Sequence, residues 1–211
     1  LARDGTPLAL SVERLQLAAS GVVALRSTRA SGHSGIAQSR GHRNPVSLVQ
    51  QLTGVSRAQA TREIRVGQSL LENSAWPGAV AGPDGVVLGG DGSEDDGISP
   101  AGPAVLWHAP IDRALLSGTI TADQHDAIRM GLGEPPAPSE ADLAAAAGPP
   151  AADELSAEEA SRRARAVMAV TWSLAADHLI TEAGLRTLEE LRAAARAVRD
   201  ELDPVGAERR F

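Results

Sequence analysis

The sequence predicts an all-α fold, a helical bundle with helix-turn-helix-like hairpins and two Gly/Pro-rich loops. Only three Trp and one Phe supply aromatic bulk in 211 residues, so the core must consist of Leu, Val, Ile and Ala, a mixture that suits packed helices. Apolar residues recur at steps of three and four along much of the chain. Several of these stretches follow a Ser or Thr that has Gln or Glu three residues later, the pattern that caps a helix start.

The first region, residues 1–76, is predicted to hold one helix and a helical hairpin. Within residues 11–29 four large aliphatic residues recur near helical spacing, and we expect their face to cover the hairpin. They are Val12, Leu15, Val22 and Leu25. The run Ser31-Gly-His-Ser-Gly then ends this helix.

The hairpin itself is predicted over residues 45–72. Asn44-Pro45 starts its first helix, because proline at an early helical position needs no amide donor. Gly54 ends that helix, since glycine tolerates a positive φ. Ser56 and Gln59 form the predicted capping box of the second helix.

The second helix of this hairpin has two different sides. Ala60, Ile64, Gly67 and Leu71 fall on one side, and Arg57, Arg62 and Arg65 fall on the other. Two interpretations fit this arrangement. In a helix-turn-helix, these arginines and the nearby Arg43 would contact DNA from a major groove. In an ordinary hairpin, the basic side simply faces solvent.

Residues 77–104 are predicted to form a flexible acidic loop, because Gly, Pro and Asp dominate and little apolar surface is available for burial. Its run Gly89-Gly-Asp-Gly-Ser-Glu-Asp-Asp-Gly lacks the ligand spacing of a helix-loop-helix calcium site. Residues 105–132 form a second predicted hairpin, in which Thr121 and Gln124 repeat the capping box. Its three Asp outnumber its two Arg, so groove insertion is unfavourable and a packing or partner surface is indicated.

The remainder is predicted to be a Pro/Ala-rich linker, residues 133–155, followed by a C-terminal helical pair, residues 156–211. Ser156 opens the first helix of the pair with a capping box. Its predicted buried stripe consists of Ala164, Val167, Leu174, Ala175 and Leu179, with Trp172 as an anchor. Thr187 opens the last helix, and Asp203-Pro204 ends it.

The charge of the chain is unevenly distributed. All twenty basic residues are Arg, a bias more typical of a GC-rich coding genome than of phosphate recognition. Residues 1–72 carry nine Arg against four acidic residues, a net +5; residues 73–142 carry −9 and residues 143–211 carry −3. The total of −7 makes the chain a poor general binder of nucleic acid, but its basic first third can dock locally.

The chain has no Cys, which excludes disulfides, thiolate zinc sites and Cys nucleophiles. No apolar run has transmembrane length, and no start resembling a secretion signal is present. We therefore expect a cytoplasmic location and no membrane contact.

No catalytic constellation is recognisable in the sequence. The five histidines, His33, His42, His108, His125 and His178, do not pair at metal-ligand spacing. Phosphate-binding loops, dinucleotide fingerprints and nucleophile elbows are also missing from the sequence. We assign no catalytic residue, no metal ligand and no cofactor to this chain.

Four stretches carry a family resemblance: Gly41-His-Arg-Asn-Pro-Val-Ser-Leu-Val-Gln, residues 107–121, residues 124–136, and Leu188-Glu-Glu-Leu together with Arg199-Asp-Glu-Leu-Asp-Pro-Val-Gly-Ala-Glu-Arg-Arg-Phe. With them the chain resembles the actinobacterial domain-of-unknown-function family 222, the thirteen-E-twelve repeat. The resemblance implies an N-terminal module of an HNH-endonuclease-like protein. It implies that a divalent metal belongs only to a C-terminal nuclease domain, whose motif no residue of this chain matches.

These observations lead to two expectations about function. The first is a helical, DNA-associating accessory module of an HNH-endonuclease-like protein, with duplex DNA contacted through Arg43, Arg57, Arg62 and Arg65 and the nuclease domain as its neighbour. The second is a helical protein-protein interaction or dimerisation module without nucleic-acid contact. The oligomeric state does not follow from the sequence.

Overall fold

The computed structural model describes residues 7–28, 34–74, 106–147 and 156–210, and every regular element within them is a helix. The predicted all-α fold class is therefore confirmed. The helices are α1 (Pro7–Leu25), α2 (Ile36–Ser39), α3 (Pro45–Thr53), α4 (Arg57–Ser74), α5 (Ala109–Ser117), α6 (Ala122–Leu132), α7 (Glu140–Ala147), α8 (Ala157–Glu182), α9 (Leu188–Leu202) and α10 (Pro204–Arg210). None of these helices combines the length and the hydropathy that crossing a bilayer requires.

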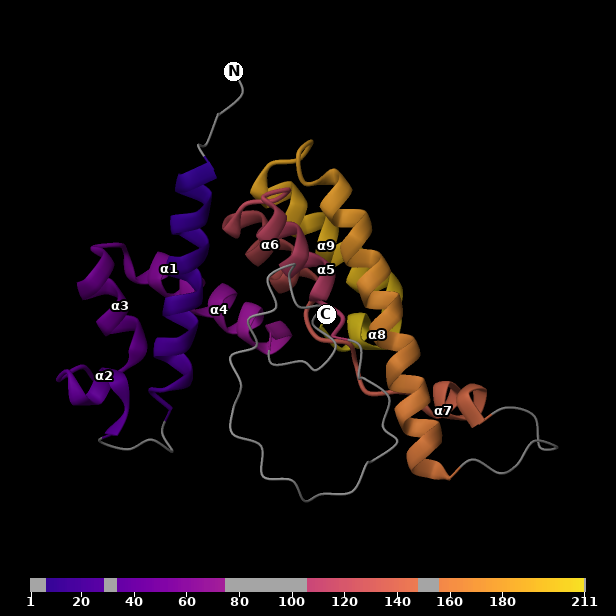
Figure 1. Cartoon of the computed structure of the whole chain (residues 1–211). Coiled ribbons are helices and arrows are strands. Elements are labelled where there is room, and N and C mark those ends of the chain that lie inside the picture. The colour runs from indigo at the N-terminus through magenta and orange to yellow at the C-terminus, as the bar shows by residue number, and fades with distance from the viewer. Residues whose placement is uncertain (1–6, 29–33, 75–105, 148–155, 211) are drawn as a thin grey trace.

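Helices α1 to α4 form one side of the molecule, with α1 packed along α4 (Figure 1). The two helices approach so closely at Gly21 and Gly67 that a Cβ atom on either glycine would overlap the backbone of the other helix. Glycine is required here because any side chain would push the helices apart. Beside this crossing, Ala24, Val49, Ala60 and Ile64 form a small apolar cluster that holds α3.

The larger core lies among α5, α6, α8 and α9, with α8 running along the outer side (Figure 1). Its largest fully buried side chains include Trp172 from α8, Ile111 from α5 and Ile128 from α6. Val66 and Leu70 of α4 also belong to this core. Helix α4 therefore contributes to both clusters and joins the two sides of the molecule.

The predicted helix ends are largely confirmed. The Asn44 side chain accepts a hydrogen bond from the Ser47 backbone amide at 2.9 Å, and Gly54 ends α3 at a φ of 71°. Complete capping boxes open α6, α8 and α9 at Thr121, Ser156 and Thr187. The capping box predicted at Ser56 is only half formed. Its hydroxyl accepts from the Gln59 amide at 3.2 Å, but the Gln59 side chain donates to Glu63 instead of returning to Ser56.

Several helices differ from the predicted segments. The predicted linker over residues 133–155 contains α7. Just before α7, the Ser139 hydroxyl accepts a hydrogen bond from the Asp142 backbone amide. The Asp142 carboxylate accepts from the backbone amide and the hydroxyl of Ser139. The chain also resumes helical structure as α10 after the stop predicted at Asp203-Pro204, and as α2 before the first hairpin. These are short segments with little apolar periodicity, which is why the sequence pattern did not show them. The acidic loop predicted at residues 77–104 lies outside the described residues.

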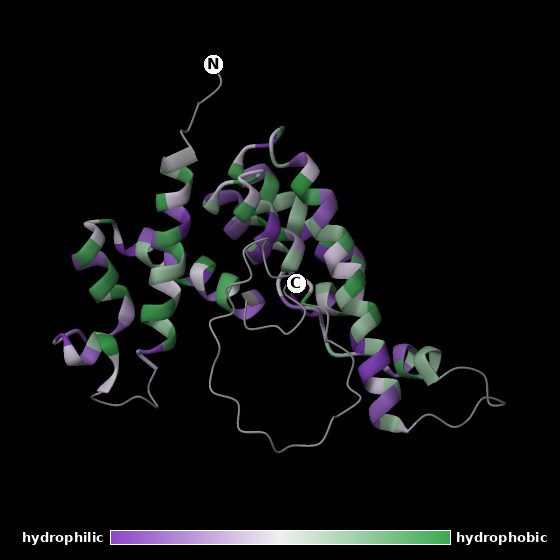
Figure 2. Ribbon diagram, viewed as in Figure 1, coloured by the Kyte–Doolittle hydropathy of each residue, from purple (hydrophilic) through white to green (hydrophobic). Residues whose placement is uncertain are grey.

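The predicted buried face of α1 is wrong, and that of α8 is correct only in part. Val12, Leu15, Val22 and Leu25 are exposed on α1, whereas Leu17, Ser20, Gly21 and Ala24 turn toward α4. On α8, Val167 and Leu174 are exposed, and the predicted Ala164, Leu179 and Trp172 are buried together with Ala160 and Ala176. Green, apolar segments recur along both helices (Figure 2), and these exposed positions are among them. In each helix small residues occupy much of the buried face, because they allow close approach, and several larger aliphatic residues stay outside.

Candidate functional site

The four arginines predicted to contact DNA divide into two pairs. Arg43 and Arg57 are exposed, and no carboxylate of the described residues lies within ion-pair distance of either. Arg62 and Arg65 are half-buried and form ion pairs with the second hairpin. The expectation that all of them turn to solvent is therefore wrong for Arg62 and Arg65.

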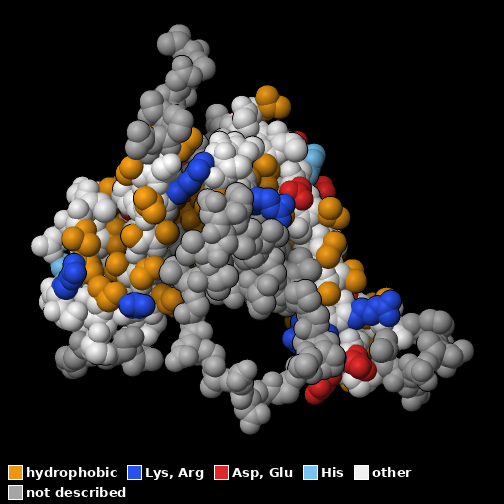
Figure 3. Space-filling view, viewed as in Figure 1, with side chains coloured by type: hydrophobic (Ala, Val, Ile, Leu, Met, Phe, Trp, Pro, Cys, Tyr) orange, Lys and Arg blue, Asp and Glu red, His pale blue; other side chains and the backbone are white. Residues whose placement is uncertain are grey.

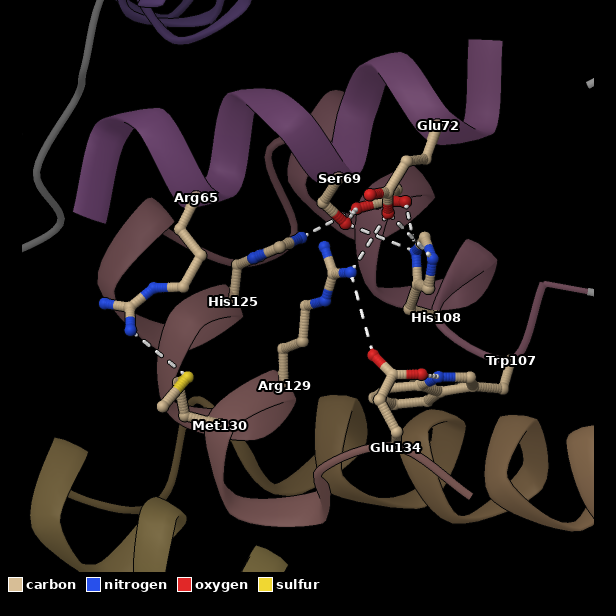
Figure 4. Close-up of polar contacts among 10 residues, drawn as sticks. Arg65, Ser69, Glu72, Trp107, His108, His125, Arg129, Met130 and Glu134 are labelled. Carbon is tan, nitrogen blue, oxygen red and sulfur yellow. Dashed lines mark hydrogen bonds and ion pairs between the residues drawn. The ribbon is translucent and has the colours of Figure 1, made fainter. Parts of the chain in front are cut away.

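These two arginines hold α4 against α6. Arg62 forms an ion pair with Asp123. The Arg65 Nε lies 2.9 Å from Asp126 Oδ1, and its Nη2 donates to Asp126 Oδ2 at 3.3 Å. Arg65 Nη1 also lies 3.2 Å from the sulfur of Met130 (Figure 4). The acidic second hairpin thus acts as a packing surface, as its charge predicted.

Helix α4 does not project into solvent as a reading helix would. Its Ala60, Ile64 and Gly67 side packs against α1 and α3, and its Arg62, Arg65 and Ser69 side meets α5 and α6. A helix that enters a major groove needs one long side free. Only a narrow strip that includes Arg57, Thr61 and Gln68 is exposed.

A buried polar network, which the sequence pattern did not reveal, lies where α4, α5 and α6 meet (Figure 4). Asp112 is at its centre and is fully buried. Its Oδ1 accepts from the Ser69 hydroxyl and from His125 Nε2, both at 2.7 Å, and its Oδ2 lies 2.9 Å from His108 Nδ1. His108 and Asp112 stand four residues apart on one helix face, and that spacing was the available signal.

The partners of Asp112 decide its protonation. Burial by itself raises the pKa of this carboxyl, but hydrogen bonds from His108, His125 and Ser69, with the charge of His125, lower the pKa to about 2. The carboxyl is therefore ionised at neutral pH and can only accept hydrogen bonds. Both imidazole nitrogens that face it must then carry a proton. The other ring nitrogen of His125, Nδ1, is buried and has no hydrogen-bond partner among the described residues.

A second layer of polar residues closes the network toward the surface. Glu72 Oε2 lies 3.6 Å from His108 Nε2 and accepts from Arg129 Nη2 at 3.1 Å. Glu134 accepts from the indole of Trp107 at 2.8 Å, and the Trp107 ring meets the His108 ring edge to face at 5.6 Å. These residues shield Asp112 and both histidines from water.

The network does not have the geometry of a nucleophilic site. In a Ser-His-Asp triad the imidazole stands between hydroxyl and carboxylate and uses a different ring nitrogen for each. Here Ser69 and Asp112 both approach Nδ1 of His108, and the hydroxyl proton goes to Asp112. Over the described ranges, no three His, Asp or Glu side chains are placed to hold a metal ion. The arrangement supports a structural clamp between the two hairpins.

A groove of about 670 Å³ lies beside this interface, between α1, α4 and the start of α6. Its floor contains Glu63, which is 8% exposed, and its walls include Val12, Leu17 and Val66. Two glutamine amides meet the Glu63 carboxylate. Gln16 Nε2 donates to Oε2 at 3.3 Å, and Gln59 Nε2 donates to Oε1 at 3.2 Å. The groove thus combines apolar walls with a buried charged group.

No protein-family model, no curated protein and no solved structure matches the chain.

Proposed function

We propose that this chain is a helical dimerisation module in which α1 pairs with α1 of a second copy. The observation that carries the proposal is the exposed aliphatic face of α1. Leu15 is 70% exposed, Leu25 61%, Val12 57% and Val22 36%. Hydrophobic side chains gather on the surface over α1 in the space-filling view (Figure 3).

The face is suited to another helix because of its spacing. Val12, Leu15, Ala19 and Val22 follow one another at steps of three, four and three, the spacing of a seam between two helices, and all four are exposed. The opposite face of α1 is occupied by α4. Burying a Leu or Val side chain is worth roughly 1.5–3 kcal/mol, so the four large residues offer a gross gain that exceeds an ordinary surface contact.

A second copy is the occupant that fits the pattern. In an antiparallel pair centred between Ala18 and Ala19, Leu15 of one copy lies opposite Val22 of the other. Small residues at the centre permit close approach of the two helices. Arg26, the one charged residue on this face, then lies opposite Ser11, whereas a parallel pair would place two Arg26 side chains together.

The oligomeric state in solution tests the proposal. Sedimentation equilibrium of the whole chain over about a hundredfold range of concentration should show a monomer-dimer equilibrium, because a single helix pair forms a small interface. Leu15→Glu should abolish the dimer. Leu185→Glu is the matched control, since Leu185 is 88% exposed outside α1, and it should dimerise as the wild type does. A wild type that stays monomeric throughout that range would refute the proposal.

A DNA-associating accessory role in an HNH-endonuclease-like protein is the second candidate. It is favoured by four exposed arginines of the basic first third that have no carboxylate within ion-pair distance among the described residues. They are Arg26, Arg40, Arg43 and Arg57. Phosphate contacts of this kind give affinities that fall steeply with salt. The resemblance found in the sequence supports the same role.

Electrophoretic mobility shifts with duplex DNA at low and high salt separate the two candidates. The second candidate requires that Arg43→Ala and Arg57→Ala each weaken binding at low salt. Arg165→Ala is the control, because Arg165 is an exposed arginine on α8 without an ion-pair partner among the described residues. Equal weakening by all three changes would show nonspecific attraction, and an absence of any shift at low salt would exclude this role.

A further inference from the structure

We propose that the groove between α1, α4 and the start of α6 binds an organic cation, an ammonium or guanidinium group carried on an aliphatic body. The proposal does not rest on the dimer, although Val12 belongs both to the groove and to the exposed face of α1. The central residue is Glu63, whose buried side chain lines this groove.

Glu63 is a buried carboxylate without a cation. Its two oxygens accept from the amides of Gln16 and Gln59, which are neutral donors. Among the described residues no Arg or His lies within ion-pair distance of it, and the adjacent Arg62 is already paired with Asp123. Burial of a charge without a counter-charge is unfavourable, so a cation entering the groove would find its complement in place.

The other charged residues of the groove favour the same ligand. Glu13 also lines it and is exposed. Since Arg62 and Asp123 neutralise each other, Glu13 and Glu63 leave the groove with a net negative charge. An anionic ligand is therefore excluded by charge.

The walls define the rest of the ligand. Val12, Leu17, Val66 and Ala122 supply aliphatic surface, and the volume of about 670 Å³ lies within the usual range of small-molecule sites. Among the described residues no aromatic side chain lines the groove, so it offers no aromatic face to a quaternary ammonium group. A primary ammonium or a guanidinium fits, because its N–H groups can donate to the carboxylate. The same chemistry is found in a free alkylamine and in an Arg or Lys side chain of a protein.

Isothermal titration calorimetry of the whole chain tests the site. The probes are hexylguanidinium, the neutral hexanol as a shape control, and a blocked Leu-Arg-Leu peptide. Hexylguanidinium or the peptide should bind and hexanol should not, and the tighter of the two cations identifies the source as a free amine or a protein side chain. Failure of both cations to bind, or equal binding of hexanol, would overturn the proposal.

Variants then locate the binding. Glu63→Gln keeps the shape and removes the charge, and we expect affinity to fall by roughly tenfold or more, as for loss of a hydrogen bond to a charged group. Glu208→Gln, an exposed acid on α10, is the control and should bind as the wild type does. Ala9→Phe narrows the groove without touching the carboxylate and should also weaken binding. Wild-type affinity in Glu63→Gln, or in Ala9→Phe with an unchanged melting temperature, would place the cation elsewhere and refute the site.

Discussion

Replacing Gly67 with alanine should separate α1 from α4. A Cβ atom at this position would lie 2.7 Å from the backbone nitrogen of Gly21 and 3.0 Å from its Cα, and would overlap the carbonyl oxygen of Leu17. All three atoms belong to the backbone of α1. No side-chain rotation can relieve the overlap, so the helix itself must move and the neighbouring contacts of Leu17 and Ala24 must loosen.

The magnitude follows from two opposing effects. Alanine favours a helix over glycine by about 1 kcal/mol, which stabilises the variant. Overpacking of a tight contact usually costs about 1–3 kcal/mol, and rigid backbone on both sides places this site at or above the upper end. We therefore expect a net loss of about 2 kcal/mol in the free energy of unfolding. For a chain of this size, that corresponds to a melting temperature lower by roughly 4–8 °C.

Urea unfolding followed by far-ultraviolet circular dichroism measures this loss. Gly184→Ala is the matched control, because no atom lies within 4 Å of a Cβ built there and its φ is not in the left-handed region. That variant should remain within about 0.5 kcal/mol of the wild type or be slightly more stable. If Gly67→Ala is as stable as Gly184→Ala, the close helix crossing described above is wrong.

Three further changes test the interface of the two hairpins. Because the pKa of Asp112 is lowered from 3.8 to about 2 by folding, its ionised form stabilises the fold above pH 4 by roughly 2 kcal/mol, and this contribution is lost as the pH falls toward 2. Asp112→Asn should therefore unfold more easily at pH 7 and show a smaller loss of stability between pH 4 and 2 in urea titrations. Arg65→Ala leaves the Asp126 side chain, which is 7% exposed, without its cation and should lower the stability of the fold by about 1–2 kcal/mol. The control Arg57→Ala should change stability by less than about 0.5 kcal/mol. Equal effects of the two changes in thermal melts would contradict the observed pairing. Thr121→Ala removes a complete capping box and should cost about 1 kcal/mol in the same melts, so an unchanged melting temperature would argue against that cap.

The features predictable from the sequence were local ones. Asn44 and Gly54 bound α3, and the hydroxyls of Thr121, Ser156 and Thr187 open their helices, because each depends on residues at most four positions away. Fold class followed from the same signals. Hydrogen bonds within one turn leave a pattern in the sequence that needs no knowledge of tertiary packing.

The orientation of the helices was not predictable in this way. Hydrophobicity favours Leu15 and Leu174 for burial, but the structure exposes both and buries Gly21 and Ala176, since small residues let helix backbones approach. That choice depends on which helix lies opposite, and spacing along one helix does not contain it.

The candidate site depended on contacts between distant segments. The opposite charges of residues 1–72 and 73–142 indicated attraction between them, but they did not specify that Arg65 meets Asp126 or that Asp112 receives His125 and Ser69. The basic side of α4 therefore resembled a DNA-reading surface when considered alone. The acidic residues that pair with it, such as Asp126 with Arg65, lie 61 residues further along the chain.

Because α4 contributes to both apolar clusters, cutting the chain after α4 should leave both fragments incompletely folded. Its Ala60 and Ile64 complete the cluster near α3, while its Val66 and Leu70 complete the core around Ile111. A peptide ending at Ser74 would thus expose Val66 and Leu70. The peptide formed by the remaining residues would lack the α4 side chains that complete its core. Neither half has the means to fold fully by itself, and the two should regain native helicity only when mixed.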